Sequence, residues 1–116
     1  PACWRAGALP SGMATARKIA APKRLKILNL TYKVRFVASI EASGWCDFDQ
    51  QEIVLAEGQS REALADTFLH EVLHAVGHLM GVDYDSEEQV VQTMATGLTT
   101  FWQANPGALK WWGSLL

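Results

Sequence analysis

Cysteine is scarce in this 116-residue chain, which contains only Cys3 and Cys46. Two cysteines cannot build the set of disulfides that stabilises small secreted domains, so a reducing compartment, the cytoplasm, is the expected setting. Long apolar runs are also missing, because no uncharged apolar stretch approaches the about 20 residues that a membrane-spanning helix needs. The first residues lack a charged start followed by an apolar run, so the sequence predicts neither a secretion signal nor a membrane anchor.

Carboxylates are absent from residues 1–40, which carry eight of the ten Lys and Arg residues. Residues 41–116 hold the other two cations and all twelve carboxylates, so their formal charge is two minus twelve, or −10. The basic segment could contact nucleic acid, but no nucleic-acid-binding motif accompanies the charge, and a solvated arm is the preferred interpretation. We expect residues 1–25 to form a flexible basic arm and residues 26–116 to form a single domain, since the chain is too short for two independent cores.

Three short strands are predicted in the first half of the chain. Residues 26–37 alternate between apolar and polar or charged side chains for most of their length, as a half-buried strand does. Residues 44–49 and 52–56 form two further short runs separated by a polar turn, which is typical of a hairpin. The expected sheet is therefore small, antiparallel and built from about three strands.

Helices are predicted for the second half. Ser60 is a suitable N-cap, and apolar residues then recur at helical spacing up to a break near Gly77 or Gly81. Ser86 caps a second amphipathic stretch, and residues 109–116 predict a short final helix. The fold class expected is α+β, with the sheet packed on the first of these helices and on the helix that follows it.

The first helix contains the motif His70-Glu71-Val72-Leu73-His74. Two histidines four residues apart lie one turn from each other on the same helix face, where both can bind one ion at about 2.1 Å. Glu71 is offset from both and can take a proton from a metal-bound water. Because the flanking residues are apolar, burying these polar groups is costly unless a metal satisfies them, although two histidines that merely hydrogen-bond are the alternative. The motif predicts a catalytic Zn²⁺ site with His70 and His74 as ligands and Glu71 as general base.

A catalytic zinc site also needs a third protein ligand and an open position for water. A third histidine at the spacing of the longer metallopeptidase motif would fall at position 80, which is Met80. His78 lies four residues after His74, but three successive turns of a straight helix diverge too far to bind one ion. Asp83 and Asp85 could fold back onto the metal, although a role in the turn or as a cap suits them better.

Glu87 and Glu88 open the next helix, where a carboxylate faces the first helix if the two helices pack antiparallel. Glu88 is the preferred third ligand, because Val91 and Ala95 lie on its face and the small Ala95 permits a close approach. Glu87 remains a rival on the same argument. For either residue the alternative is a charge that complements the dipole of the second helix.

With these residues in view, the chain resembles the small gluzincin-type HExxH zinc metallopeptidases, compact phage- and bacterium-encoded proteins that are distantly similar to ImmA/IrrE-type proteins. The resemblance covers about residues 26–112. The matching parts are the strand at 27–37, Gly44, Cys46-Asp47, Ile53-Val54-Leu55, Leu69-His70-Glu71-Val72-Leu73-His74-Ala75, Glu87-Glu88-Gln89-Val90-Val91, Met94-Ala95 and Asn105-Pro106.

The resemblance implies a zincin-type active-site helix, a following ligand helix and a cytoplasmic, zinc-dependent hydrolase of peptide bonds. His70 and His74 would be zinc ligands, Glu71 the general base and later the general acid, and Glu88 or Glu87 the third ligand. The substrate would be a peptide or a protein. An extended peptide is expected to add to the strand at 53–56, since that strand directly precedes the site helix.

A different class of function stays open, a zinc-stabilised binding or regulatory module of phage or bacterial origin without hydrolytic activity. Such a module would dock a partner through the Trp-rich C-terminus, at Trp111 and Trp112. Glu71 argues against it, because a structural zinc site closes with four protein ligands and gains nothing from a spare base. A contiguous exposed aromatic patch would favour the binding module.

Overall fold

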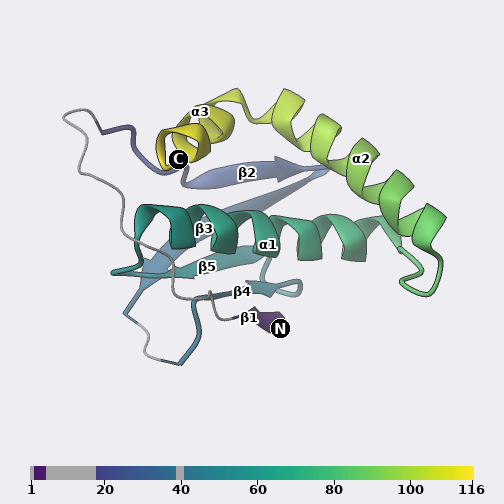
Figure 1. The fold of residues 1–116 in the computed structure, drawn as a ribbon, viewed down its shortest axis with the longest axis horizontal. Coiled ribbons are helices and arrows are strands. Elements are labelled where there is room, and N and C mark those ends of the chain that lie inside the picture. Colours follow the sequence, from purple (N-terminus) through teal and green to yellow (C-terminus); the bar gives the residue numbers. More distant parts are fainter. Residues whose placement is uncertain (1, 5–17, 39–40) are drawn as a thin grey trace.

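A computed structural model describes residues 2–4, 18–38 and 41–116, the side chains from residue 18 onward, and shows the α+β fold (Figure 1). One layer is a five-stranded sheet with the strand order β1-β4-β5-β3-β2. The strands are β1 (Ala2–Trp4), β2 (Arg24–Ile27), β3 (Leu30–Val37), β4 (Gly44–Asp47) and β5 (Glu52–Ala56). The helices are α1 (Arg61–Met80), which crosses one face of the sheet, α2 (Glu87–Ala104) and α3 (Pro106–Ser114).

The stretch expected to be one strand over residues 26–37 is a hairpin. Strands β2 and β3 pair antiparallel, with Ile27 opposite Leu30. The chain reverses between them at Leu28, which has a φ of 53°. The side chain of Leu28 is 36% exposed, so it belongs to the turn and not to the buried face. Alternating apolar residues could not reveal this reversal, because both arms of the hairpin continue the same pattern.

The sheet is mixed, whereas we expected a purely antiparallel sheet of about three strands. Strand β5 pairs antiparallel with β4, which confirms the predicted hairpin, but it pairs parallel with β3. Both edges of β5 are therefore covered, and Ile53, Val54 and Leu55 are 0% exposed. The expectation that a peptide adds to residues 53–56 is wrong, since a central strand has no free edge.

The N-terminal arm expected over residues 1–25 overlaps the sheet at both of its ends. Strand β1 pairs antiparallel with β4, with Ala2 opposite Cys46, and β2 already begins at Arg24. The part of the arm from 5 to 17 lies outside the described residues. The described ends of this segment thus belong to the domain.

Helix α1 begins and ends where the sequence predicts. The Ser60 hydroxyl accepts a hydrogen bond from Ala63 N at 3.2 Å, and Gly81 ends the helix in the left-handed conformation. The inner face of α1 buries Phe68 and Val72 against the sheet, both at 0% exposure. None of the helices in the described part of the chain is both long and apolar enough to cross a membrane.

Helices α2 and α3 are fixed to α1 and to the sheet at two polar points. Asn105, at the junction of α2 and α3, accepts a hydrogen bond from Lys26 N at 2.8 Å and donates one to Lys26 O at 2.7 Å. The indole N–H of Trp112 donates to Ala65 O at 2.8 Å. Trp111 is 3% exposed and packs edge-on against Phe68. Trp111 and Trp112 thus both make contacts with α1 within the molecule.

Candidate metal centre

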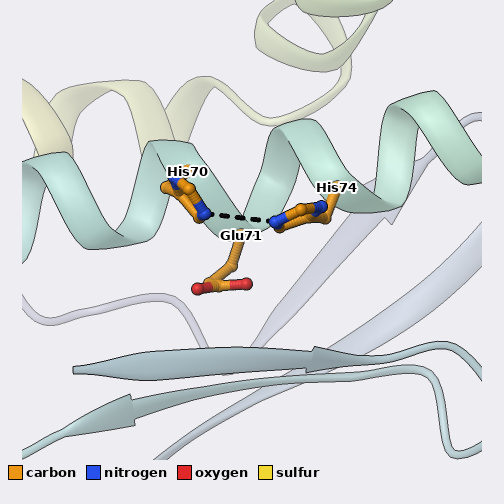
Figure 2. Close-up of side chains that lie close together, drawn as sticks. All are labelled: His70, Glu71 and His74. Carbon is orange, nitrogen blue, oxygen red and sulfur yellow. Dashed lines mark hydrogen bonds between the residues drawn. The ribbon is translucent and has the colours of Figure 1, made fainter. Parts of the chain in front are cut away.

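The middle of α1 brings the three predicted site residues together (Figure 2). The Nε2 atoms of His70 and His74 point toward each other and lie 3.1 Å apart, while Glu71 points from the helix toward the sheet. One ligand atom from each of the three lies within 4.8 Å of the other two. Within residues 18–38 and 41–116, no other group of three His, Cys, Asp or Glu side chains meets this condition.

The distance between the two imidazole nitrogens suits a single ion. Two bonds of about 2.1 Å that meet at a tetrahedral angle place the nitrogens about 3.4 Å apart, close to the observed 3.1 Å. Burial lowers the pKa of His74, and burial followed by the charge of His74 lowers the pKa of His70, against an opposing effect of Asp66. Both rings therefore favour the neutral form that binds metals. The group of His70, Glu71 and His74, which we call the metal group, could hold a metal ion.

The Glu71 carboxyl group is fully buried, at 0% exposure, between α1 and the sheet. Neither of its oxygens accepts a hydrogen bond from the described residues. Burial raises the pKa of Glu71 to about 7. A buried carboxyl group without a hydrogen-bond donor is costly, so it marks a place where a water or a cation would be stabilising. At neutral pH such a group can both accept and return a proton.

Strand β4 passes close beneath Glu71 because it begins with a glycine. A Cβ atom at Gly44 would lie 2.8 Å from Thr67 Cγ2, 2.8 Å from Val54 O and 3.5 Å from Glu71 Cγ. No larger residue fits without moving α1 away from the sheet. The resemblance included Gly44, but the sequence alone did not indicate that it sets the depth of Glu71.

Cys46 faces the same side of β4 as Gly44 and is fully buried. Burial raises the pKa of its thiol to about 12, with a further contribution from the Glu71 carboxylate. The thiol therefore remains neutral beside Glu71 and adds no second negative charge. Cys46 is a free cysteine.

Gln59 fixes the position of α1 over β4 and β5, a role that the sequence did not reveal. Its amide nitrogen donates to Ser43 O and to Ala56 O, both at 3.0 Å. Its amide oxygen accepts a hydrogen bond from Thr67 Oγ1 at 2.9 Å. One side chain thus connects the start of β4, the end of β5 and the turn of α1 that precedes His70.

The expected third ligand, Glu88, is not part of the group. Gly97 is the point of close approach between α2 and α1, where an added Cβ would collide with Val76. Glu88 lies nine residues before Gly97, about 14 Å farther along α2 and toward the C-terminal end of α1. It is exposed in the first turn of α2, as is Glu87. The short connection places this turn opposite the end of α1 and not opposite its middle.

The other candidates lie beyond the group as well. His78 stacks on Phe48, with ring centroids 3.9 Å apart and planes 4° apart. Asp83 has the turn role that we considered for it, because its carboxylate accepts a hydrogen bond from Asp85 N at 3.0 Å. Tyr84 places its hydroxyl group over Gly77, where any side chain would collide with it.

A hollow of about 330 Å³ opens beside His74. It is lined by Phe48, His74, Gly77, His78, Gly81, Val82 and Tyr84. A larger hollow of about 520 Å³ lies between residues 21–24 and β3, and it includes none of the three residues of the metal group. Of these two hollows, only the one of about 330 Å³ shares a residue, His74, with that group.

The arrangement brings two neutral imidazoles and a buried carboxyl group of raised pKa together on one helix, next to a hollow that can receive a ligand. Comparisons with protein-family models, with curated proteins and with solved structures give no match for this chain.

Proposed function

We propose that this chain is a zinc-dependent peptidase, in which His70 and His74 hold the metal and Glu71 transfers protons. One observation carries the proposal. A buried carboxyl group without a hydrogen-bond donor lies within 4.8 Å of two imidazole nitrogens that converge to 3.1 Å. Helix histidines that merely hydrogen-bond to each other would not need such a carboxyl group beside them.

Zinc, when bound, supplies a Lewis acid that polarises a carbonyl oxygen and lowers the pKa of a water to about 7. The residues of the chain orient the site and transfer the protons. His70 and His74 orient the site from one rigid helix. Glu71, whose pKa of about 7 leaves it partly ionised at neutral pH, accepts the proton of the attacking water and returns it to the leaving amine.

The number of ligands favours catalysis over a structural metal site. A structural zinc site closes with four protein ligands, whereas the described residues bring together two imidazoles and the Glu71 carboxyl group, to which we assign proton transfer. A metal held by His70 and His74 would therefore remain open to a water and a substrate. The binding-module alternative is less well supported, since Trp111 is buried and the partly buried Trp112 donates its N–H to Ala65 O.

A peptide substrate is supported by the strand nearest to Glu71. Strand β4 accepts an extended segment along its outer edge, since β1 pairs with it antiparallel from Ala2 to Trp4. An extended peptide makes the same main-chain hydrogen bonds when it adds to a sheet edge. The edge proposed for the substrate is therefore the β4 edge that β1 covers, which becomes available only when β1 is displaced, and no longer residues 53–56.

The test compares zinc content and peptide cleavage in the wild type, Glu71→Gln and His74→Ala. A mixture of unstructured peptides is incubated with each zinc-loaded protein, and new termini are identified by mass spectrometry. We expect Glu71→Gln to keep its zinc and to lose about 10²-fold or more in rate, as removal of a general base does. His74→Ala should lose both the zinc and the cleavage. Undiminished cleavage by Glu71→Gln would rule out the role proposed for this carboxyl group.

A further inference from the structure

We propose that the hollow beside His74 selects a basic side chain, Lys or Arg, on the residue next to the peptide bond that is cleaved. This inference rests on the proposed peptidase function and names its substrate class.

The hollow continues the metal site toward the C-terminal end of α1. His74 belongs to both, and Gly77, one turn farther along, forms the floor without a side chain. The hydroxyl group of Tyr84 and Val82 Cγ1 pack over this glycine. A substrate whose scissile carbonyl lies at His70 and His74 therefore places a neighbouring side chain in this space. The volume of about 330 Å³ is enough for a long side chain.

Aromatic rings form the walls of the hollow. Phe48 and His78 stack face to face on one side, and Tyr84 closes another. The methylene stem of Lys or Arg packs well on such rings, and the electron-rich faces of the rings attract the cationic head group. No Lys or Arg is among the residues that line the hollow.

The position at the end of α1 also favours positive charge. The helix ends at Gly81, within the lining of the hollow, so the negative end of the helix dipole is directed at this space. Residues 41–116 contain only two cations, Arg61 and Lys110. Arg61 begins α1, 17 residues and therefore about 25 Å before His78. It is too far away to offset the negative potential there.

Two acidic loops flank the hollow. Asp47 and Asp49 line a neighbouring hollow of about 300 Å³ that shares Phe48 and His78 with the first. On the other side, Asp83 and Asp85 stand on either side of Tyr84 in the chain and are exposed. A cationic side chain is thus attracted from both loops, whereas an acidic side chain is repelled by both.

The test uses three peptides that are identical except for the residue beside the cleaved bond, which is Lys, norleucine or Glu. Norleucine keeps the stem of Lys and removes its charge. Cleavage by the zinc-loaded wild type gives kcat/KM, and binding to Glu71→Gln gives the affinity by fluorescence anisotropy. We expect Lys to exceed norleucine by about 10-fold in both readouts and Glu to be the poorest, with the difference shrinking as salt is added.

The double variant Asp49→Asn and Asp85→Asn removes one charge from each loop without removing a side-chain hydrogen-bond acceptor that the structure uses. We expect its preference for Lys over norleucine to fall several-fold. The matched control is Glu57→Gln, an exposed carboxylate at the opposite end of α1, which should keep the full preference.

The outcomes separate this inference from the function on which it rests. Equal cleavage of the Lys and norleucine peptides would overturn the basic specificity and leave the peptidase proposal standing. Preferential binding of the Lys peptide without cleavage of any peptide would support the basic hollow and overturn the peptidase proposal. Loss of the preference for Lys in Glu57→Gln as well as in the double variant would also overturn the basic specificity of the hollow, because the preference would then depend on net charge alone.

Discussion

Burial of Glu71 makes the stability of the metal-free chain depend on pH. Its folded-state pKa of about 7 lies above the ordinary value of 4.5, so the folded chain keeps a proton that the unfolded chain releases between these values. The free energy of unfolding therefore falls as pH rises from about 4.5 to about 7. A shift of this size corresponds to about 3 kcal/mol.

We expect Glu71→Gln to remove this dependence. His70 and His74, whose pKa values are lowered, act in the opposite direction below pH 6.5, but the wild type and the variant share them. The informative quantity is the difference in unfolding free energy between the two proteins, measured with urea in EDTA. The free energy of unfolding of the variant should rise relative to that of the wild type by about 2.5 kcal/mol from pH 5 to pH 8. A difference that does not change with pH would show that Glu71 is not buried as described.

Gly44 sets the distance between α1 and β4, so a methyl group there should disturb both stability and the metal group. Gly44→Ala must displace Thr67 or Val54, and overpacking of this kind costs about 2 kcal/mol. We expect lower stability and weaker zinc binding by calorimetry. Gly113→Ala is the matched control, because its Cβ meets nothing within 4 Å, and it should change neither property. Equal zinc affinity in both variants would argue against the role of Gly44.

The residues of the metal group could be predicted because helix geometry alone brings them together. His70, Glu71 and His74 lie within five positions of one helix. Gly44, Cys46 and Gln59 could not be assigned in the same way, since they reach the site through the pairing of β4 with β5 and the packing of α1 on both. Those contacts depend on the sheet topology, which the sequence pattern left open.

Helix α2 was predicted correctly as an element, but its contacts with α1 were not. Its cap at Ser86 and its start at Glu87 are as predicted. Glu88 lies outside the group of His70, Glu71 and His74 because α2 follows α1 after a short turn, which places the first turn of α2 opposite the last turn of α1. The close approach at Gly97 occurs two turns and more after Glu88.

Strand β1 occupies the edge of β4 that we propose for the substrate. A chain that begins at Lys18 lacks β1 and exposes this edge next to Glu71. We expect peptide kcat/KM to increase several-fold, because the substrate no longer competes with a strand of the same chain. The control is the unfolding free energy of the shortened protein, which should show that the domain stays folded. Unchanged kcat/KM in a folded, zinc-loaded protein would exclude the β4 edge as the substrate position.

At the scale of the whole molecule, cations gather on the outer face of the sheet, where Arg35 pairs with Glu52 at 3.1 Å. The alternating residues Arg24, Lys26, Lys33 and Arg35 are exposed, whereas Leu25, Ile27, Tyr32 and Val34 are buried toward the helices. The basic face of the sheet is therefore the one away from the metal group, and the acidic loops flank the site. The sequence shows this division only along the chain, as a basic first third and an acidic remainder. In the fold, the basic residues of the strands lie on the outer face of the sheet, and the acidic loops lie near the metal group.

Asn105 connects the two halves of the molecule across 79 positions of the sequence. Besides its two bonds to Lys26, its amide donates to Phe101 O at 2.8 Å, and the residue is 9% exposed. Asn105→Ala leaves these backbone groups unpaired, and we expect a loss of about 2 kcal/mol in urea unfolding. Gln103→Ala, an exposed change in the same helix, should cost far less. Similar losses in the two variants would mean that this connection contributes little.

Zinc content decides whether α1 holds one metal ion through His70 and His74, as we propose. It is measured by elemental analysis of the purified, reconstituted wild type, His74→Ala and Glu88→Ala. We expect one zinc per chain in the wild type and in Glu88→Ala, and none in His74→Ala, because Glu88 is exposed and outside the metal group. A wild type that takes up no zinc, or a His74→Ala variant that keeps it, would rule out this metal site.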